Sequence, residues 1–380
     1  MIKKKKICVV ATVPVALKVF MVEHINKLTE KYSVTVMANA EPEQIYQFLD
    51  KSIRFIPLPI QRKVSVFSDV VSLLKLFKIF TVENFDCVLS IMPKSGLLTM
   101  LAGYFARVPR RVHIFTGQVW YTKQGFSRFA LKKLDQLLAS AATHLLADSP
   151  SQRDFLIEEN VVKPAKIEVL GQGSISGVDL ARFKANVVMR EKIRRELGLD
   201  DSALVFLFMA RLTHVKGIVD LARAFSDVAV SCPDAHLLVV GPDEDGIEHV
   251  VTELGLKFKG RCHRVGFTNN PEGYMAASDV FSLPSYREGF SLATIQAAGV
   301  GLPAIASRIY GLSDAVQEGK TGLLHQPGAI GEISAAMRML YSDAGLRMKL
   351  AEAARHRAHT DFAQPIIINE MSLYMDRLLA

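Results

Sequence analysis

The chain has 380 residues, a length typical of a protein with about two globular domains. Hydrophobic residues make up 49% of the sequence and charged residues 22%, as in a globular protein, and no apolar stretch approaches the roughly 20 residues of a membrane-spanning helix. The net charge of +8 favours an acidic partner, either a phosphate-bearing ligand or an anionic membrane surface. No nucleic-acid partner is expected, because the sequence has no RNP motif, zinc-finger spacing or long basic helix.

The first residues, MIKKKKICVVAT, combine a basic cluster with a short apolar run, as a signal peptide does. Pro14 and Lys18 interrupt the apolar run and no clear cleavage site follows, so we interpret residues 6–11 as a buried first strand. The cysteines are scattered without the spacing of a metal site: Cys8, Cys87, Cys232 and Cys262. We therefore expect a protein of the reducing cytoplasm with no metal site.

Short apolar runs alternate with longer amphipathic segments along the chain. In the first half the runs predicted to be strands are residues 6–12, 32–38, 54–60, 86–91, 111–115 and 143–148. After residue 200 the predicted strands are residues 204–210, 235–240, 261–265, 279–283 and 303–307. The alternation predicts an α/β fold in which each half forms a parallel sheet covered by helices.

The segment 169–183, rich in Gly and Ser, separates the two series and is interpreted as a linker. It divides the chain into an N-terminal Rossmann-like domain over residues 1–175 and a C-terminal one over residues 176–361. Ligands of parallel sheets bind beyond the carboxyl ends of the strands, so we expect a ligand in a cleft between the two sheets.

The segment RLTHVKG, residues 211–217, follows the first strand of the second series. Arg211 and Lys216 leave this strand together, and Gly217 opens the next helix. Two cations beside a helix N-terminus form an anion site that suits a diphosphate. The alternative is that both side chains are solvated loop charges.

Two further turns follow strands of the second series. In GPDEDG, Gly241 and Pro242 permit a sharp turn and a close backbone approach. The carboxylates at 243–245 are interpreted as a helix cap, with a metal site as the alternative. The turn at 266–268 is a candidate pocket lining, whereas His263 is placed in a strand.

The stretch PSYREGFSLATIQAAGVGLPAI begins where another buried strand ends. Glu288 lies in the turn, where a carboxylate can accept hydrogen bonds from sugar hydroxyls. Residues 289–291 are expected to start a helix with free backbone N–H groups, and Gln296 lies two turns further on roughly the same face. An amide that donates and accepts suits a ribose. The alternative is an N-cap carboxylate and a surface amide.

Together these motifs resemble the retaining glycosyltransferases of the GT-B fold known as group 1 or family 4. The resemblance rests on ARLTHVKG, VVGPDE, EGFSLATIQAAGVGLP, GSISGVDLARF and RIYGLSDAVQEGKTGLLH. It spans most of the chain and all of its C-terminal half. It implies two Rossmann-like domains facing across a cleft, with a nucleotide-sugar in the second domain and the acceptor in the first. The last segment, about 362–380, is expected to be a helix that packs back on the first domain.

The resemblance also implies roles for single residues. Arg211 and Lys216 would stabilise the leaving diphosphate, and Glu288 would hold the donor sugar, which makes these three the candidate catalytic residues. Further donor contacts are expected from Gly241, Pro242, Phe267, Thr268, Tyr286, Gly289, Phe290, Ser291, Leu292 and Gln296.

The sequence departs from the family pattern in three places. Gln296 stands where relatives carry a second Glu, and we expect weaker donor binding with activity retained. Thr116 stands where many relatives carry a His before Gly117, and His113 is placed inside a strand, so no catalytic His is assigned. The segment 11–20 replaces the Gly-rich first loop of many relatives.

The segments IFTGQVW, PKSGLL and GSISGVDL resemble a subgroup that builds bacterial surface polysaccharides on polyprenyl-diphosphate-linked acceptors at the inner membrane. Lys94, in the PKSG turn, is a candidate contact for the acceptor phosphate, with a solvated loop lysine as the alternative. Thr116 and Gly117 complete the expected acceptor side.

Residues 64–80 predict a helix whose polar residues form one stripe beside a wide apolar face. Lys3–Lys6 add a basic cluster that would favour an anionic surface. We expect most of the apolar face to cover the sheet, as a Rossmann-type helix does; the alternative is an exposed edge that touches lipid.

The predicted function is retaining transfer of a sugar from a nucleotide-sugar, UDP-hexose or UDP-N-acetylhexosamine, to a lipid-linked saccharide. The cell location would be the cytoplasm, peripheral to the inner membrane. The expected mechanism is front-face attack within an ion pair, without cofactor or metal, because Arg211 and Lys216 supply the positive charge. The alternatives are a nucleotide-sugar epimerase of the same architecture and a catalytically silent nucleotide-sugar-binding protein.

Overall fold

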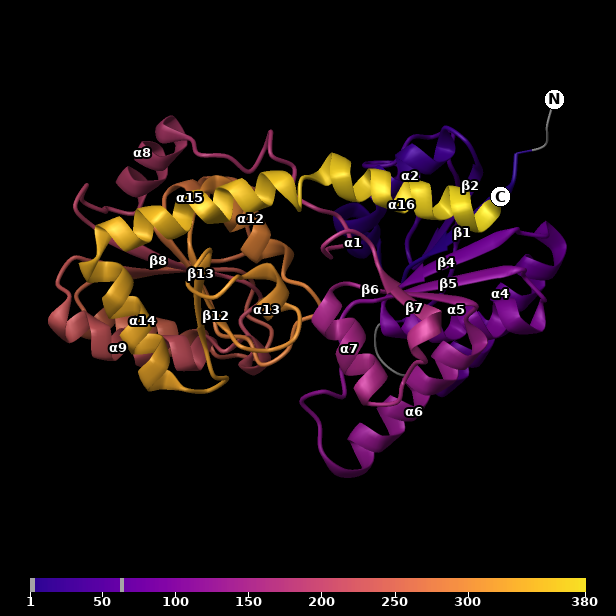
Figure 1. Ribbon diagram of the computed structural model, residues 1–380, viewed down its shortest axis with the longest axis horizontal. Helices are drawn as coiled ribbons and strands as arrows, with labels where there is room; N and C mark the ends of the chain where they lie inside the picture. Colours follow the sequence, from indigo (N-terminus) through magenta and orange to yellow (C-terminus); the bar gives the residue numbers. More distant parts are fainter. Residues whose placement is uncertain (1–3, 62–64) are drawn as a thin grey trace. The chain divides into compact units, whose positions relative to one another are not determined.

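The computed structural model describes residues 4–61 and 65–380 (Figure 1). Their contacts divide the chain into two units: unit 1 comprises residues 1–176 and 365–380, and unit 2 comprises residues 177–364. Each unit contains a sheet of parallel strands with helices packed on it, so the predicted α/β architecture is confirmed. Lys3 of the basic cluster and Val64 of the predicted helix lie outside the described residues.

The described part of unit 1 contains a seven-stranded sheet in the order β3-β2-β1-β4-β5-β6-β7. The strands are β1 (Lys6–Val10), β2 (Ser33–Ala38), β3 (Arg54–Pro57), β4 (Cys87–Ile91), β5 (Arg110–Phe115), β6 (His144–Ala147) and β7 (Ile167–Val169). The sequence analysis missed β7, which is a three-residue strand at the edge of the sheet. A strand this short is not distinguishable from the adjoining linker by its sequence pattern.

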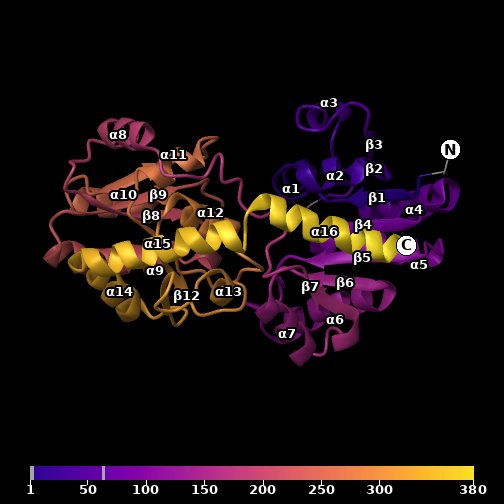
Figure 2. The ribbon, with the colours of Figure 1, turned by 45° about the horizontal axis from the view of Figure 1, so that its top comes forward.

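The helices of unit 1 cover both faces of its sheet. They are α1 (Pro14–Ala16), α2 (Val22–Thr29), α3 (Pro42–Ile45), α4 (Val66–Glu83), α5 (Pro93–Phe105), α6 (Gly125–Ala141), α7 (Pro150–Glu158) and α16 (Gln364–Leu379). Side chains alternate along a strand, so Val9 joins the core with α2 and α16, whereas Val10 joins the core with α4, α5 and α6. Figure 2 shows α16 lying along unit 1 beside α2.

The last helix, α16, contributes to the core of unit 1 although it is far from the other elements in sequence. Met371, Tyr374 and Met375 are buried in the core that contains β1 and α2. The Tyr32 hydroxyl donates a hydrogen bond to Asp376 Oδ1 (2.7 Å), and Lys31 Nζ lies 2.5 Å from Asp376 Oδ2. Apolar burial and this polar anchor hold the C-terminal segment to unit 1.

The described part of unit 2 contains a six-stranded sheet in the order β10-β9-β8-β11-β12-β13. The strands are β8 (Leu204–Met209), β9 (Ala235–Val240), β10 (Cys262–Val265), β11 (Val280–Leu283), β12 (Ala304–Ser307) and β13 (Gly322–His325). The helices are α8 (Val187–Glu196), α9 (Ile218–Ser231), α10 (Glu248–Lys257), α11 (Pro271–Ala276), α12 (Leu292–Val300), α13 (Leu312–Ala315), α14 (Ile330–Ser342) and α15 (Ala344–Thr360). The sequence analysis missed β13, another short edge strand.

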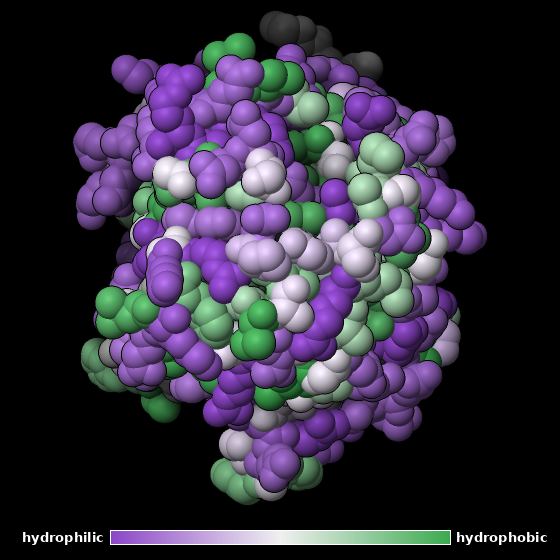
Figure 3. Space-filling view, turned by 90° about the vertical axis from the view of Figure 1, so that its left-hand side faces the viewer, coloured by the Kyte–Doolittle hydropathy of each residue, from purple (hydrophilic) through white to green (hydrophobic). Residues whose placement is uncertain are grey.

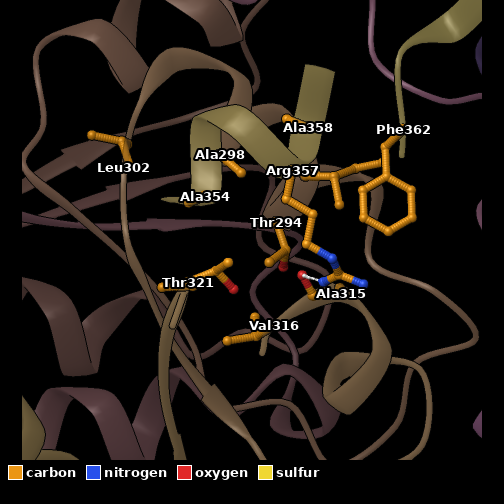
Figure 4. Close-up of a pocket in the computed structure, with 12 residues that line it drawn as sticks. Thr294, Ala298, Leu302, Ala315, Val316, Thr321, Ala354, Arg357, Ala358 and Phe362 are labelled. Atoms are coloured by element: carbon orange, nitrogen blue, oxygen red, sulfur yellow. Dashed lines mark hydrogen bonds between the residues drawn. The ribbon is translucent and has the colours of Figure 1, made fainter. Parts of the chain in front are cut away.

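Helices α12 and α15 pack against each other, and Figure 4 shows Thr294 and Ala298 of α12 and Ala354 and Ala358 of α15 lining one small pocket. Arg357 donates hydrogen bonds to Ala315 O (3.0 Å) and Asp314 O (2.8 Å), and its guanidinium lies over the ring of Phe362. Phe362 in turn packs against Phe290, with ring centroids 5.3 Å apart. The cavity left in this region is about 10 Å³, so it is a packed support and not a ligand site.

Helix α4 contradicts the expectation that its apolar face covers the sheet. Leu76 and Phe80 are buried, but Phe67, Leu74 and other large apolar side chains point to solvent. Only part of the polar stripe faces inward: Ser72 is fully buried and donates a hydrogen bond to Pro59 O (3.0 Å), whereas Lys75 and Lys78 of the same stripe are exposed. The backbone carbonyls after β3 need donors, and the hydroxyls of α4 supply them.

His113 lies inside β5, as predicted, and is fully enclosed. Its Nδ1 is 2.9 Å from Ser90 Oγ, and the ring packs so closely on Gly96 that a Cβ there would lie 2.3 Å from His113 Cε1. Burial lowers the pKa of His113 to about 3.

We predict that His113 makes the protein less stable in mild acid. Below about pH 6.5 His113 becomes protonated in the unfolded chain, whereas in the folded chain it stays neutral until the pH approaches its pKa of about 3. The free energy of unfolding therefore decreases as the pH is lowered through this window. The slope due to this one group approaches about 1.4 kcal/mol per pH unit.

Urea unfolding of the wild type and of His113→Gln between pH 4 and pH 7 tests this. The variant loses packing at every pH, but its pH slope should be shallower than that of the wild type. Parallel slopes would show that His113 is protonated in the folded protein.

Candidate functional site

The predicted donor residues of unit 2 lie on loops that follow neighbouring strands. Strands β10, β9, β8 and β11 are adjacent and parallel, so their carboxyl ends meet at one edge of the sheet. The loop after β8 carries Arg211 and Lys216, and the loop after β11 carries Glu288. Sheet topology therefore gathers residues that are up to 77 positions apart.

The loop after β8 packs against the loop after β11 without an intervening side chain. Gly217 has φ +73°, and a Cβ there would lie 2.0 Å from Pro284 O. The two loops are also joined by a hydrogen bond from Tyr286 N to Val215 O (2.8 Å). Only glycine fits this position, and α9 begins at the next residue, as predicted from the sequence.

The loop after β9 makes a similar close approach to the loop after β8. Gly241 has φ +140°, and its Cβ would lie 1.9 Å from Ala210 O. Asp243 Oδ1 accepts from Gly246 N (2.9 Å) and its Oδ2 from Glu248 N (2.8 Å) at the start of α10. The interpretation of this acidic turn as a helix cap is confirmed for Asp243.

Lys216 and Glu288 form an ion pair between the two loops, with Lys216 Nζ donating to Glu288 Oε1. Ser285 Oγ donates to the same oxygen over 2.9 Å. The side chains are only 17% and 11% exposed, so solvent screens the pair little. The carboxylate is thus held in one position by two donors, and neither charged group is a solvated loop charge.

Arg211 is the more accessible of the two predicted cations. Its Nη1 lies 2.5 Å from Glu244 Oε2, and the Arg211 side chain is 43% exposed. An exposed ion pair of this kind contributes little stability, so Arg211 can exchange Glu244 for an anionic ligand at small cost.

Arg287 adds a third cation, to which the sequence analysis gave no role. Burial lowers the pKa of Arg287, while Tyr310 and Glu288 act in the opposite direction and Arg211 lowers it further. Arg287 directly precedes Glu288 in the loop after β11, so it lies in the same turn as the Lys216–Glu288 ion pair. Its position directly before Glu288 in the same turn was the available signal.

The other predicted donor residues differ in their surroundings. The Tyr286 hydroxyl donates to Asp220 Oδ2 (2.5 Å) on α9, which raises the pKa of Tyr286 to about 12. Phe267 is exposed, and Thr268 Oγ1 accepts from Asn270 N (3.0 Å) ahead of α11. Tyr286 and Thr268 therefore shape the loops in addition to any contact with a ligand.

The start of α12 differs slightly from the expectation. The helix begins at Leu292, and residues 289–291 form the preceding turn. Ser291 is the N-cap, with its Oγ accepting from Thr294 N (3.3 Å). Gln296 is half-buried on this helix and makes no side-chain hydrogen bond with the residues that the structure describes. Its amide retains its capacity to donate and accept.

The predicted acceptor residues lie together in unit 1. Lys94 is in the first turn of α5, after β4, and Thr116 and Gly117 follow the neighbouring strand β5. Lys94 Nζ lies 2.6 Å from Asp69 Oδ1 of α4, and both side chains are largely buried. The alternative of a solvated loop lysine is therefore wrong, because Lys94 is paired and helical.

Comparison with known proteins decides the family. Residues 22–173 match the model of the glycosyl transferase 4-like domain, and residues 189–357 match that of glycosyl transferases group 1. The chain is 30% identical over 303 residues to an Escherichia coli UDP-Gal:alpha-D-GlcNAc-diphosphoundecaprenol alpha-1,3-galactosyltransferase, covering 78% of this chain and 76% of the relative. The chain belongs to the group 1 glycosyltransferases.

Two further similarities describe this group 1 glycosyltransferase. It is 28% identical to the capsular polysaccharide biosynthesis glycosyltransferase CapM of Staphylococcus aureus, over 92% of both chains. Its fold resembles the crystal structure of Anabaena Alr3699/HepE in complex with UDP, with a TM-score of 0.81 at 18% identity over 98% of this chain and 100% of that one. The predicted GT-B fold is confirmed.

We predict that Gly217→Ala destabilises the protein more than Gly246→Ala. Both glycines have positive φ, +73° and +70°, but a Cβ at 246 meets no atom within 4 Å, whereas at 217 it overlaps Pro284 O. The difference in the free energy of unfolding should be about 1–3 kcal/mol, because the loops must separate.

Gly246→Ala is the matched control, since it carries the same backbone strain without the overlap. Chemical denaturation of both variants gives the comparison. Equal losses would mean that the close approach of the two loops contributes nothing.

Proposed function

We propose that this group 1 glycosyltransferase transfers a hexose or N-acetylhexosamine from a UDP-sugar to a polyprenyl-diphosphate-linked saccharide during surface polysaccharide biosynthesis. The observation that carries the proposal is the match to the Escherichia coli enzyme, whose name specifies a UDP-sugar donor and a diphosphoundecaprenol-linked acceptor. The similarity to CapM supports the biosynthetic role, and the UDP complex of the structural neighbour supports the choice of nucleotide.

In the proposed donor complex, Arg211 and Lys216 bind the diphosphate and Arg287 adds positive charge beside them. Glu288 holds the sugar: Lys216 and Ser285 both donate to Oε1, which leaves Oε2 as an acceptor for a sugar hydroxyl. The ion pair resolves the repulsion expected between a carboxylate and a diphosphate, because Lys216 lies against Glu288 and neutralises it. Gln296 binds the ribose without the strength of a charged partner.

The proposed reaction retains the anomeric configuration. The bond between the anomeric carbon and the diphosphate oxygen breaks, and the acceptor hydroxyl attacks the same face of the resulting cation. The departing diphosphate oxygen takes the proton of that hydroxyl. Arg211 and Lys216 act where negative charge develops, which lowers the barrier to the chemical step, and we propose that this charge replaces a metal ion and that no cofactor takes part.

The acceptor side is proposed to be the edge of the unit 1 sheet near Lys94, Thr116 and Gly117. Lys94 offers a cation for the lipid-linked diphosphate, in exchange for Asp69. No helix in the described residues is long and apolar enough to cross a bilayer. We propose that the enzyme works from the cytoplasm, peripheral to the inner membrane, where a polyprenyl-linked acceptor is held.

A transfer assay tests this function. The protein is incubated with UDP-glucose, UDP-galactose or their N-acetyl forms and with a polyprenyl-diphosphate-linked N-acetylhexosamine. We expect a longer glycolipid with one donor, with the new linkage retaining the donor's anomeric configuration by NMR. An altered free nucleotide-sugar would indicate an epimerase, and tight binding without turnover a silent binding protein; either result would overturn the proposal.

We predict that Lys216→Ala lowers kcat/KM far more than Gln296→Ala. Lys216 meets charge that develops in the transition state, so its loss should cost roughly 10²–10³-fold. Gln296 meets only the ribose, and removing one neutral hydrogen bond should cost roughly fivefold, mainly in KM for the donor. Steady-state kinetics with both substrates measure the two effects.

Gln296→Glu is the matched control for this comparison. It restores a carboxylate at a position of the same size, so donor KM should fall while kcat stays near the wild-type value. Equal losses for Lys216→Ala and Gln296→Ala would contradict the assigned roles.

A further inference from the structure

Helix α4 has apolar side chains on two sides: Leu76 and Phe80 enter the core of unit 1, and a second apolar stripe faces solvent. Phe67, Val70, Val71, Leu74 and Phe77 recur at helical spacing on one exposed stripe, with Phe67 83% and Leu74 61% exposed. On the buried side Ser72 Oγ donates to Pro59 O (3.0 Å) in the loop after β3, while the exposed Lys75 donates through Nζ to Pro57 O (2.8 Å) at the end of β3.

The neighbouring helices also expose large apolar side chains. α5 packs between α4 and α6 on the same face of the unit 1 sheet (Figure 1). Tyr104 and Phe105 are exposed at the end of α5, and Phe126 (82% exposed) and Phe129 are exposed at the start of α6. We call these exposed side chains of α4, α5 and α6 the α4–α6 face.

The charges on these helices have one sign where they reach solvent. Lys75, Lys78 and Lys133 are exposed and form no ion pair with the residues that the structure describes. The helices carry three acidic residues, and none is an exposed, uncompensated charge. Asp69 pairs with Lys94, Glu83 pairs with Arg54, and Asp135 is buried and accepts from Trp120 Nε1 (2.7 Å).

The described residues of unit 2 have no comparable surface. Their exposed large apolar side chains are distributed over separate elements: Val187, Val188, Val230, Leu256, Phe267, Met339 and Met348. Figure 3 shows the side of the molecule at the left of Figure 1, where hydrophilic residues predominate and hydrophobic ones are interspersed among them. Exposed large apolar side chains also occur elsewhere in the described residues, but α4 carries more of them than any other helix: Val66, Phe67, Val70, Val71, Leu74, Phe77 and Val82.

We propose that the α4–α6 face is the surface by which the enzyme binds an anionic lipid bilayer. Phenylalanine rings and branched apolar side chains enter the headgroup region, and unpaired lysines attract anionic lipids without an opposing carboxylate. Lys94 joins α4 to the expected acceptor side, so the face is continuous with the place where a lipid-linked substrate would be used. The proposal rests on the proposed function for its purpose, but binding can be measured without any sugar transfer.

The test is flotation of the full-length protein with phosphatidylcholine vesicles that contain phosphatidylglycerol. We expect the wild type to float with these vesicles and to remain in solution with phosphatidylcholine alone or at high salt. Phe67→Glu/Leu74→Glu should weaken partitioning more than roughly tenfold. Lys78→Gln/Lys133→Gln should weaken it about fivefold per lysine and reduce the salt dependence.

Val187→Glu/Val188→Glu, on exposed positions of α8, is the matched control and should float like the wild type. Circular dichroism confirms that each variant is folded, and light scattering gives its mass in solution. The proposal is overturned if the α4 variant floats like the wild type. It is also overturned if the wild type is a dimer that does not bind vesicles and the α4 variant is a monomer. In that case the face would bind a second copy of the chain. If the protein floats with vesicles but shows no transfer in the assay, the proposed function is contradicted and the proposed membrane-binding surface is supported.

Discussion

The candidate site depends on the close contact between the loop after β8 and the loop after β11. Two parallel strands end side by side, and a glycine at 217 lets the backbones that follow them touch. Only because of this contact does Lys216 reach Glu288 and hold its carboxylate together with Ser285. The ammonium group of Lys216 and the carboxylate of Glu288 are thereby held in contact at the end of the sheet, beside the N-terminus of α9.

In the proposed donor complex, the same arrangement would let one site bind two chemically different parts of a nucleotide-sugar. A diphosphate requires positive charge and a sugar requires hydrogen-bond acceptors. An isolated carboxylate beside a diphosphate would be repelled, and an isolated buried lysine would be costly. Lys216 and Glu288 neutralise each other as a pair, and in the proposed complex the more exposed Arg211 would exchange Glu244 for the ligand at little cost.

Much of the fold and of the site could be predicted from the sequence, and the failures have physical causes. Continuous apolar runs identify buried strands, but β7 and β13 are short edge strands whose patterns are too brief to recognise. Arg211, Lys216 and Glu288 were selected because charged residues directly follow strands, and the structure brings these strand ends to one edge of the sheet. Arg287 was not selected because the sequence alone does not say which residue of a turn points inward. The orientation of α4 was predicted wrongly because hydrophobic periodicity indicates how apolar residues are spaced around a helix, but not which side of the helix packs on the sheet. In the structure Ser72 and Lys75 of α4 donate hydrogen bonds to the carbonyls of Pro59 and Pro57, contacts that the sequence pattern does not reveal.

Helix α16 has a consequence for how the polypeptide acquires its structure. The core of unit 1 includes Met371, Tyr374 and Met375, which the ribosome makes after all of unit 2. When synthesis has reached β7, the apolar side chains of β1 and α2 that α16 covers are therefore still exposed. They remain a site for aggregation until nearly two hundred more residues have been synthesised. Unit 2, whose segments are contiguous, can mature first, so the half that is synthesised earliest is completed last.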